Sequence, residues 1–218
     1  ADPVSQQEEL DRVLDVIHAV TESGGLVSAD TRRAGVMCAA LKAGAKIVND
    51  VTALTFENDS AGVVAQAGCP VILMHIRGEP KTMQNNPYFD DVVLEVYDDL
   101  AERVAAAEAA GISRERIIVD PGIGFGKTFG HNLTLLQNLS IFHGLGAGLL
   151  VGLSRKGFIG AITGVEDAGK RASGSIGAAF SCIMQGVHIM RVHDLAATRQ
   201  ALDAWNYAVG NAHLHPGA

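Results

Sequence analysis

Short polar side chains recur along this 218-residue chain, each directly after a short apolar run. Asp30, Asn49 and Asp120 follow three different runs. Because an ionised carboxylate accepts two parallel hydrogen bonds, this trio suits a heterocycle that carries several N–H donors. Magnesium is the competing ligand, since three oxygen side chains can hold Mg²⁺, although that ion often shares its sites with phosphate and water. The trio alone leaves both ligands open.

The segment 120–127 (DPGIGFGK) is the strongest single motif. It has three glycines in five residues and ends in Lys127, but it lacks the GK[ST] ending of a Walker loop and the GxGxxG spacing of a dinucleotide site. Its glycines let the backbone approach a flat or anionic ligand closely. The alternative is a tight turn in which Asp120 only caps a helix.

Two further clusters carry cations. The segment 152–156 (GLSRK) places two cations and a hydroxyl at a predicted helix start, where anions are favoured. The alternative there is a solvated basic turn. In the segment 191–194 (RVHD), alternation along a strand end points Arg191 and His193 the same way, which suits two donors to phosphate oxygens. Asp194 faces elsewhere and is predicted to cap the following helix.

These groups need a framework that brings strand ends together. Six apolar runs alternate with segments of helical spacing, a pattern typical of parallel βα units. Buried strands are predicted at 26–30, 47–49, 71–74, 117–120, 149–154 and 187–191, and the clearest helices at 91–110 and 195–209. Polar residues follow every strand, and the carboxyl ends of all strands converge on one pocket in a (β/α)₈ barrel. The pattern therefore favours an α/β fold of the TIM-barrel type over a doubly wound sheet.

The chain is predicted to form one barrel domain over residues 1–218. Eight βα units in a barrel of about 250 residues average about 31 residues each, and six strands are visible in the sequence. We therefore expect two strands and one helix, about 50–60 residues on that average, to be absent from the amino end.

The composition excludes several classes of protein. With 17 basic and 24 acidic side chains, the formal charge is −7, which argues against general nucleic-acid binding. No stretch approaches the roughly 18 consecutive apolar residues of a membrane span. The three cysteines are far apart and form no CxxC pair, so neither a disulfide framework nor a zinc site is expected. We expect a cytoplasmic protein.

Together the motifs resemble the dihydropteroate synthase family, whose members are pterin-binding (β/α)₈ barrels. The matching segments, in chain order, are SADT (28–31), IVND (47–50), LMHIRGEPKTMQ (73–84), DPGIGFGK (120–127), GLSRK (152–156), SGSIG (173–177) and RVHD (191–194). They cover essentially the whole chain. The resemblance implies a transferase of folate biosynthesis that condenses 6-hydroxymethyl-7,8-dihydropterin diphosphate with p-aminobenzoate and releases diphosphate.

The resemblance implies a role for each matching residue in pterin binding. Asp120, Asn49 and Lys156 would hydrogen-bond the pterin, with Asp30 near the ring nitrogens, where positive charge develops. The residues that would line the pterin slot are Met74, Phe125 and Gly152. The residues that would take part in catalysis are Asp30, Lys156, Arg191 and His193.

The resemblance also assigns the other two ligand groups. Arg191 and His193 match the pair that binds diphosphate in the family, and Arg155 would stack on or near the ring. Ser154 and Lys156 lie where the family shapes its p-aminobenzoate site. Position 157 is Gly, where many members have a Ser whose hydroxyl helps to hold the p-aminobenzoate carboxylate, so backbone donors are expected to serve here.

Mg²⁺ and a homodimer are further implications of the resemblance. The family Asn that helps to place Mg²⁺ lies on its first strand, and this chain matches strands three to eight, so we assign no metal ligand and expect weak or absent turnover. One alternative is a corrinoid-linked methyltetrahydrofolate methyltransferase, which shares the pterin barrel but needs no contact with diphosphate. The other is a non-catalytic truncated barrel.

Overall fold

The computed structural model describes residues 4–79 and 81–210, in which strands and helices alternate. The strands are β1 (Ser28–Asp30), β2 (Ile47–Asp50), β3 (Val71–Met74), β4 (Ile117–Asp120), β5 (Gly148–Gly152) and β6 (Ile189–Arg191). The α-helices are α1 (Gln6–Glu22), α2 (Ala34–Lys42), α3 (Ser60–Ala67), α4 (Val92–Ala109), α5 (Phe129–Gln137), α6 (Gly157–Thr163), α7 (Ala172–Met184) and α8 (Leu195–Ala208). The short 3₁₀ helices are η1 (Arg114–Arg116), η2 (Leu139–Leu145) and η3 (Ala168–Lys170).

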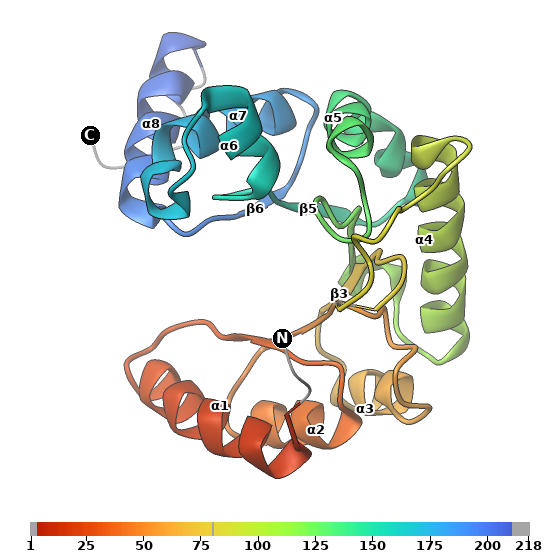
Figure 1. The fold of residues 1–218 in the computed structure, drawn as a ribbon. Helices are drawn as coiled ribbons and strands as arrows, with labels where there is room; N and C mark the ends of the chain where they lie inside the picture. The colour runs from red at the N-terminus through yellow and green to blue at the C-terminus, as the bar shows by residue number, and fades with distance from the viewer. Residues whose placement is uncertain (1–3, 80, 211–218) are drawn as a thin grey trace.

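The strands form one parallel sheet in chain order, and the sheet is curled. Flat strands spaced about 4.8 Å apart would place the first and sixth about 24 Å apart. Instead, the Arg191 guanidinium at the end of β6 lies 3.5 Å from the Asp30 carboxylate at the end of β1. The helices follow one another around the outside in an arc from α1 to α8 (Figure 1). The described strands thus form a curled half-barrel of the parallel α/β type predicted from the alternation.

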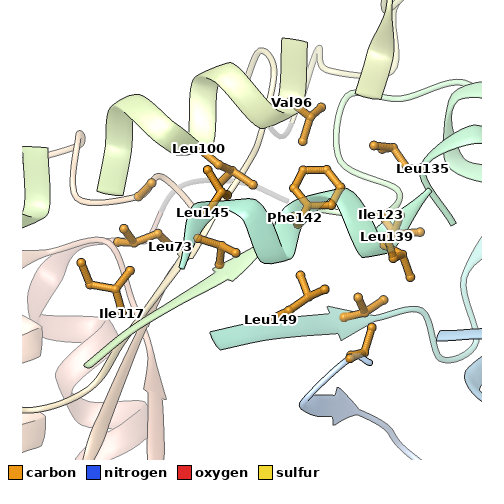
Figure 2. Packing of buried hydrophobic residues seen from close by; sticks show 14 of the residues in the cluster. Leu73, Val96, Leu100, Ile117, Ile123, Leu135, Leu139, Phe142, Leu145 and Leu149 are labelled. Carbon is orange, nitrogen blue, oxygen red and sulfur yellow. The ribbon is translucent and has the colours of Figure 1, made fainter. Parts of the chain in front are cut away.

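The core lies between the outer face of the sheet and the helices. Phe142 of η2 is fully buried at its centre, between α4 and β5 (Figure 2). Leu73 and Leu149 approach it from the sheet, and Leu100 approaches from α4. The prediction of a helix at 91–110 is confirmed within one residue at each end, because Asp91 caps its first turn with bonds from two backbone amides and Gly111 follows with a φ of 95°.

Three strands are shorter than predicted, and the prediction that every strand is buried is wrong for β1 and β6. The predicted strands at 26–30 and 187–191 narrow to the bounds of β1 and β6, and the strand predicted at 149–154 begins one residue earlier and ends at Gly152, so that Ser154 lies in a loop. The outermost strands each pair with one neighbour, and Ile189 on β6 remains 38% exposed. A run of apolar letters cannot distinguish an edge strand from a central one, because both can carry the same residues.

In residues 4–79 and 81–210, no helix combines the length and the apolar character needed to cross a bilayer.

Candidate active site at the carboxyl ends of the strands

Alternation along the strands separates core residues from site residues. The outer, helix-facing side contributes these residues to the core: Val48, Val71, Leu73, Ile117, Val119, Leu149 and Val151. Strand register places the intervening residues on the opposite, inner face. The strand residues predicted for the site all lie on that inner face, and they are Asp30, Asn49, Met74, Asp120, Gly152 and Arg191. The structure therefore brings together residues that are up to 161 positions apart, from 30 to 191.

One cluster joins the two outermost strands to β2. The Asn49 amide donates to Asp30 Oδ2 at 3.0 Å, and the Arg191 guanidinium lies 3.5 Å from the same oxygen. The side chains of Asp30 and Arg191 are 47% and 63% exposed. Because both groups are in contact with water, their ion pair is weak and the guanidinium can turn to an incoming anion.

Asp120 is the buried carboxylate of the site. One of its oxygens accepts from the Gly122 amide at 2.8 Å, and the side chain does not cap α5, whose first turn is capped by Thr128. Burial raises the pKa of the Asp120 carboxyl above its usual value, while the nearby charge of Lys156 acts in the opposite direction. Because little water reaches this carboxylate, hydrogen bonds from the N–H donors of a ligand would stabilise its charged form.

Lys156 extends from the β5–α6 loop to the glycine-rich segment after β4. Its ammonium donates to the Ile123 carbonyl and lies 4.7 Å from the centre of the Phe125 ring. Burial lowers the pKa of Lys156 to about 8, although Asp120 favours the charged form. Asp120 and Lys156, which are predicted to contact the pterin, and Phe125, which is predicted to line its slot, therefore lie together around this segment.

The β5–α6 loop contacts Asp194 and His193, which follow β6. The predicted capping role of Asp194 is wrong. Asp194 occupies the N-cap position of α8, but its carboxylate pairs with the Arg155 guanidinium at 2.6 Å and makes no capping bond. This pair holds the Arg155 guanidinium beside the start of α8, whereas the predicted stacking of Arg155 on a ring stays a prediction. Ser154 is buried, and its hydroxyl lies 3.1 Å from Nδ1 of His193. His193, which is predicted to bind the anion, therefore contacts Ser154 in the loop that is predicted to shape the p-aminobenzoate site.

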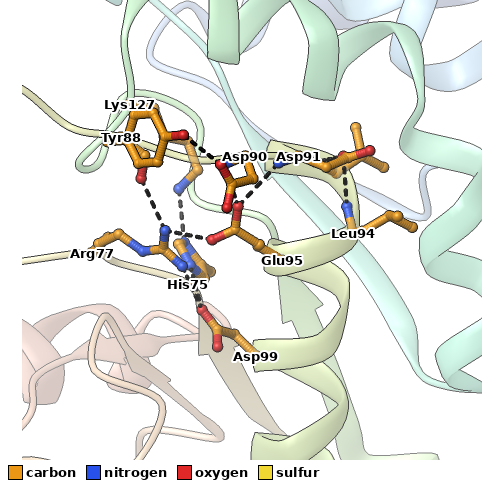
Figure 3. A network of polar contacts seen from close by, with 10 residues as sticks. His75, Arg77, Tyr88, Asp90, Asp91, Leu94, Glu95, Asp99 and Lys127 are labelled. Atoms are coloured by element: carbon orange, nitrogen blue, oxygen red, sulfur yellow. Dashed lines mark hydrogen bonds and ion pairs between the residues drawn. The ribbon is translucent and has the colours of Figure 1, made fainter.

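Sequence reasoning missed a polar network behind the glycine segment. Lys127 is 2% exposed, and its Nζ lies 2.8 Å from Nδ1 of His75 (Figure 3). His75 continues to Asp99, and Arg77 pairs with both Glu95 and Asp99 on α4. Desolvation lowers the pKa of Lys127 to about 7. The available signal was positional, because His75 directly follows β3 and Asp120 ends the adjacent parallel strand β4, so residues that follow these strands are near in space.

A cavity of about 330 Å³ opens beside this network. Gly124, Lys156 and Gly157 line it, together with Phe129 and Phe158. It combines an ammonium, an exposed helix start and aromatic walls. Such a lining suits a small aromatic molecule that carries an anionic group.

Comparison with known proteins agrees with this arrangement. A family model described as "Pterin binding enzyme" matches residues 1–193. The dihydropteroate synthase of Escherichia coli strain K12 is 44% identical over 200 residues, which are 91% of this chain and 70% of that protein.

Two solved structures of Xanthomonas albilineans dihydropteroate synthase have the same fold. The structure with 4-aminobenzoic acid has a TM-score of 0.89 and 42% identity, and the match covers 96% of this chain and 74% of that one. The structure in complex with 7,8-dihydropteroate has a TM-score of 0.88 and 42% identity, with 94% and 76% covered. The chain belongs to the pterin-binding enzyme family, and its function is that of the dihydropteroate synthases, transferases of folate biosynthesis.

Proposed function

We propose that the inner face of the half-barrel binds 6-hydroxymethyl-7,8-dihydropterin diphosphate and condenses it with p-aminobenzoate. The observation that carries the proposal is that a buried negative group and an exposed positive group lie on different strands of this face. A buried carboxylate, Asp120, lies at β4, and an exposed guanidinium, Arg191, lies at β6 beside Asp30. A ligand with an N–H edge at one end and a diphosphate at the other matches this arrangement.

Pterin recognition would centre on Asp120. Its raised pKa reflects an unfavourable burial of charge, which N–H donors of a pterin edge would relieve. Asn49 offers an amide from β2, Met74 supplies apolar surface from β3, and Phe125 supplies an aromatic ring beside Lys156. Lys156, whose ammonium lies over the Phe125 ring, can also donate to a pterin acceptor.

The reaction breaks the C–O bond between the pterin methylene and diphosphate, and the electron pair leaves with the diphosphate. Arg191 and His193 would stabilise the departing charge, and the Asp30 carboxylate would stabilise the cation that develops on the pterin. The amine of p-aminobenzoate then forms a C–N bond to the methylene and loses a proton. An amine is already nucleophilic, so the chain needs no activated serine or cysteine.

The p-aminobenzoate would occupy the cavity beside Lys156 and Gly157. Its carboxylate would meet the Lys156 ammonium and the backbone amides at the start of α6, as the family resemblance implies for a chain with Gly at position 157. Ser154 and Arg155 shape the same loop from behind, through His193 and Asp194. The Xanthomonas albilineans enzyme with 4-aminobenzoic acid supports a site for this molecule in the family.

Magnesium, a homodimer, a cytoplasmic location and the match to strands three to eight of the family barrel also remain proposals. Within the described part of the chain, no group of three His, Cys, Asp or Glu side chains is placed to hold a metal ion. Assays with and without a chelator test the metal, and sedimentation tests the dimer.

The direct test supplies both substrates with Mg²⁺ and measures dihydropteroate and diphosphate together. Equal amounts of the two products are expected, and the loss of both in Arg191→Met would link turnover to the diphosphate contact. Methyl transfer from methyltetrahydrofolate would favour the rival transferase. Pterin binding without product, in this chain and in an amino-terminally extended version, would favour a non-catalytic barrel.

A further inference from the structure

Lys127 is a buried cation that the proposed reaction does not use. It ends the glycine-rich segment, and its Nζ lies 2.8 Å from Nδ1 of His75 and 3.0 Å from the carbonyl oxygens of Gly122 and Phe125. A lysine ammonium has three N–H donors, so each donor has one of these acceptors. All of its hydrogen bonds therefore go to the protein itself, and none is left for a ligand.

His75 is in the right form to accept this bond. Burial lowers the pKa of His75 to about 3, and the charges of Lys127 and Arg77 act in the same direction, so the ring is neutral near pH 7. Its Nε2 lies 3.1 Å from a carboxylate oxygen of Asp99. Because a carboxylate only accepts, Nε2 has the proton and the lone pair of Nδ1 faces Lys127 (Figure 3).

The acceptors of Lys127 are the two ends of one turn. The Gly122 carbonyl also accepts from the Phe125 amide at 3.0 Å, and the Gly122 amide donates to Asp120. Gly122 has a φ of 66°, and a Cβ there would clash with the backbone carbonyl of His75. The turn therefore packs closely against His75, which follows β3. The buried Lys127 ammonium donates hydrogen bonds to both ends of this turn.

From this geometry we infer that Lys127 is a positioning residue of the pterin site. With His75 behind it, Lys127 holds the turn that presents Phe125 to the inner face and fixes the Gly122 amide against Asp120. The inference rests on the proposed function, because the pterin is the ligand that this turn would meet. It differs from the family roles assigned above, since Lys127 acts on the turn and not on the substrate.

The first experiment compares Lys127→Met with Lys46→Met. Methionine keeps most of the lysine volume and removes its three donors, and Lys46 is an exposed lysine that directly precedes β2. Calorimetry measures binding of 6-hydroxymethyl-7,8-dihydropterin and, separately, of diphosphate. In Lys127→Met we expect pterin binding to weaken at least about tenfold, as for loss of a hydrogen bond to a charged group, with diphosphate binding unchanged. Lys46→Met should change neither affinity.

The second experiment tests the same link from the other side and serves if Lys127→Met does not fold. His75→Asn keeps an acceptor near the position of Nδ1, whereas His75→Leu removes it. Weaker pterin binding in His75→Leu, with recovery in His75→Asn, is expected. Equal pterin affinity in the two variants would overturn the inference, because any effect would then come from packing alone.

Asp120→Asn separates the two possible failures. If Asp120→Asn weakens pterin binding and Lys127→Met does not, the site is correct and Lys127 does not position it. If both variants bind the pterin as the parent does, the proposed site itself is wrong. Equal weakening of pterin and diphosphate binding in Lys127→Met would indicate general damage and would also overturn the inference.

Discussion

The glycine-rich turn after β4 and the β1–β6 end of the same inner face are held in opposite ways. At the turn, Asp120 and Lys127 are 7% and 2% exposed, and both are hydrogen-bonded to backbone. At the other end, Asp30 and Arg191 are about half exposed, and they approach each other at 3.5 Å. One end is therefore ordered by the protein, whereas the other is a loose ion pair in water.

The difference indicates how binding free energy is divided between the two ends. Ordering a long side chain at a binding site costs about 0.5–1.5 kcal/mol. That cost falls on Arg191 when an anion binds, but the buried turn is already ordered. We therefore expect the turn to provide pterin affinity and selectivity, and the β1–β6 end to provide charge that is readily engaged and released with the diphosphate.

The largest expected effect is that of Asp120→Asn on pterin binding. The substitution keeps the shape of the side chain and removes its charge, at a cost of about 1.5–3 kcal/mol for a hydrogen bond to a charged group. Burial raises the pKa of this carboxyl, so the free variant should unfold at a temperature no lower than the parent. Calorimetry and thermal melting measure the two quantities. Pterin affinity equal to that of the parent would remove Asp120 from the site.

The pH dependence of pterin binding should approach the same size. Because burial raises the pKa of Asp120, affinity should fall on acidification at a higher pH than for an ordinary aspartate, as the carboxylate takes up a proton. On the alkaline side, Lys127 and Lys156 lose protons near their lowered pKa values of about 7 and about 8, so affinity should fall again. A titration of the dissociation constant should be bell-shaped. In Asp120→Asn the acidic limb should vanish.

Arg191→Met should have a smaller effect, which depends on salt. An exposed charge pair contributes at most about 1 kcal/mol, and salt screens it. Diphosphate binding should therefore weaken most at low ionic strength and little at high ionic strength. Pterin affinity should be the same in Arg191→Met as in the parent at both low and high ionic strength. A loss of diphosphate binding that is independent of salt would show that Arg191 is buried when the anion is bound, contrary to the comparison.

Asn49→Ala should weaken pterin binding by about 0.5–1.5 kcal/mol, the net value of a neutral hydrogen bond. Asn49 lies between the two ends, and its amide also donates to Asp30 at 3.0 Å. Diphosphate binding should change only slightly, through Asp30. Calorimetry with each ligand measures the division. A larger loss of affinity for diphosphate than for pterin would assign Asn49 to the β1–β6 end of the inner face.

Gly157→Ser is expected to produce a gain in affinity. Gly157 starts α6, and a Cβ added there would meet no atom within 4 Å. Gly157→Ser should fold as the parent does and should strengthen p-aminobenzoate binding by up to about 1 kcal/mol, through one added hydrogen bond. Thermal melting and calorimetry test both. Unchanged p-aminobenzoate affinity would place its carboxylate away from α6.

The sequence predicts the parallel framework well, because alternation between apolar runs and helical periods depends on local spacing. It also places Asp30, Asn49, Asp120 and Arg191 at strand ends, and register then brings them to one face. The Lys127–His75 contact could not be predicted in this way, since Lys127 lies about seven residues beyond the end of β4 and strand register does not fix where the intervening turn directs it.

Local rules also gave the wrong partner for Asp194. The position before α8 favours an aspartate cap, and the residue does occupy that position. Its carboxylate nevertheless bonds to Arg155, which the β5–α6 loop brings within reach with a φ of 62°. The position of a side chain can be predicted from neighbouring residues, but its choice of partner depends on distant ones.

The close packing of the glycine turn has a consequence for how this protein can change over generations. A Cβ at Gly122 or Gly126 would clash with the backbone carbonyl of His75 or Arg77, and both glycines have left-handed φ values. Any heritable change at these two positions is expected to damage the wall that the pterin meets. Position 157 has open space, so a side chain there causes no clash. Under selection by a compound that occupies this site, escape variants should therefore collect around the p-aminobenzoate cavity, and pterin mimics should meet the more constant wall.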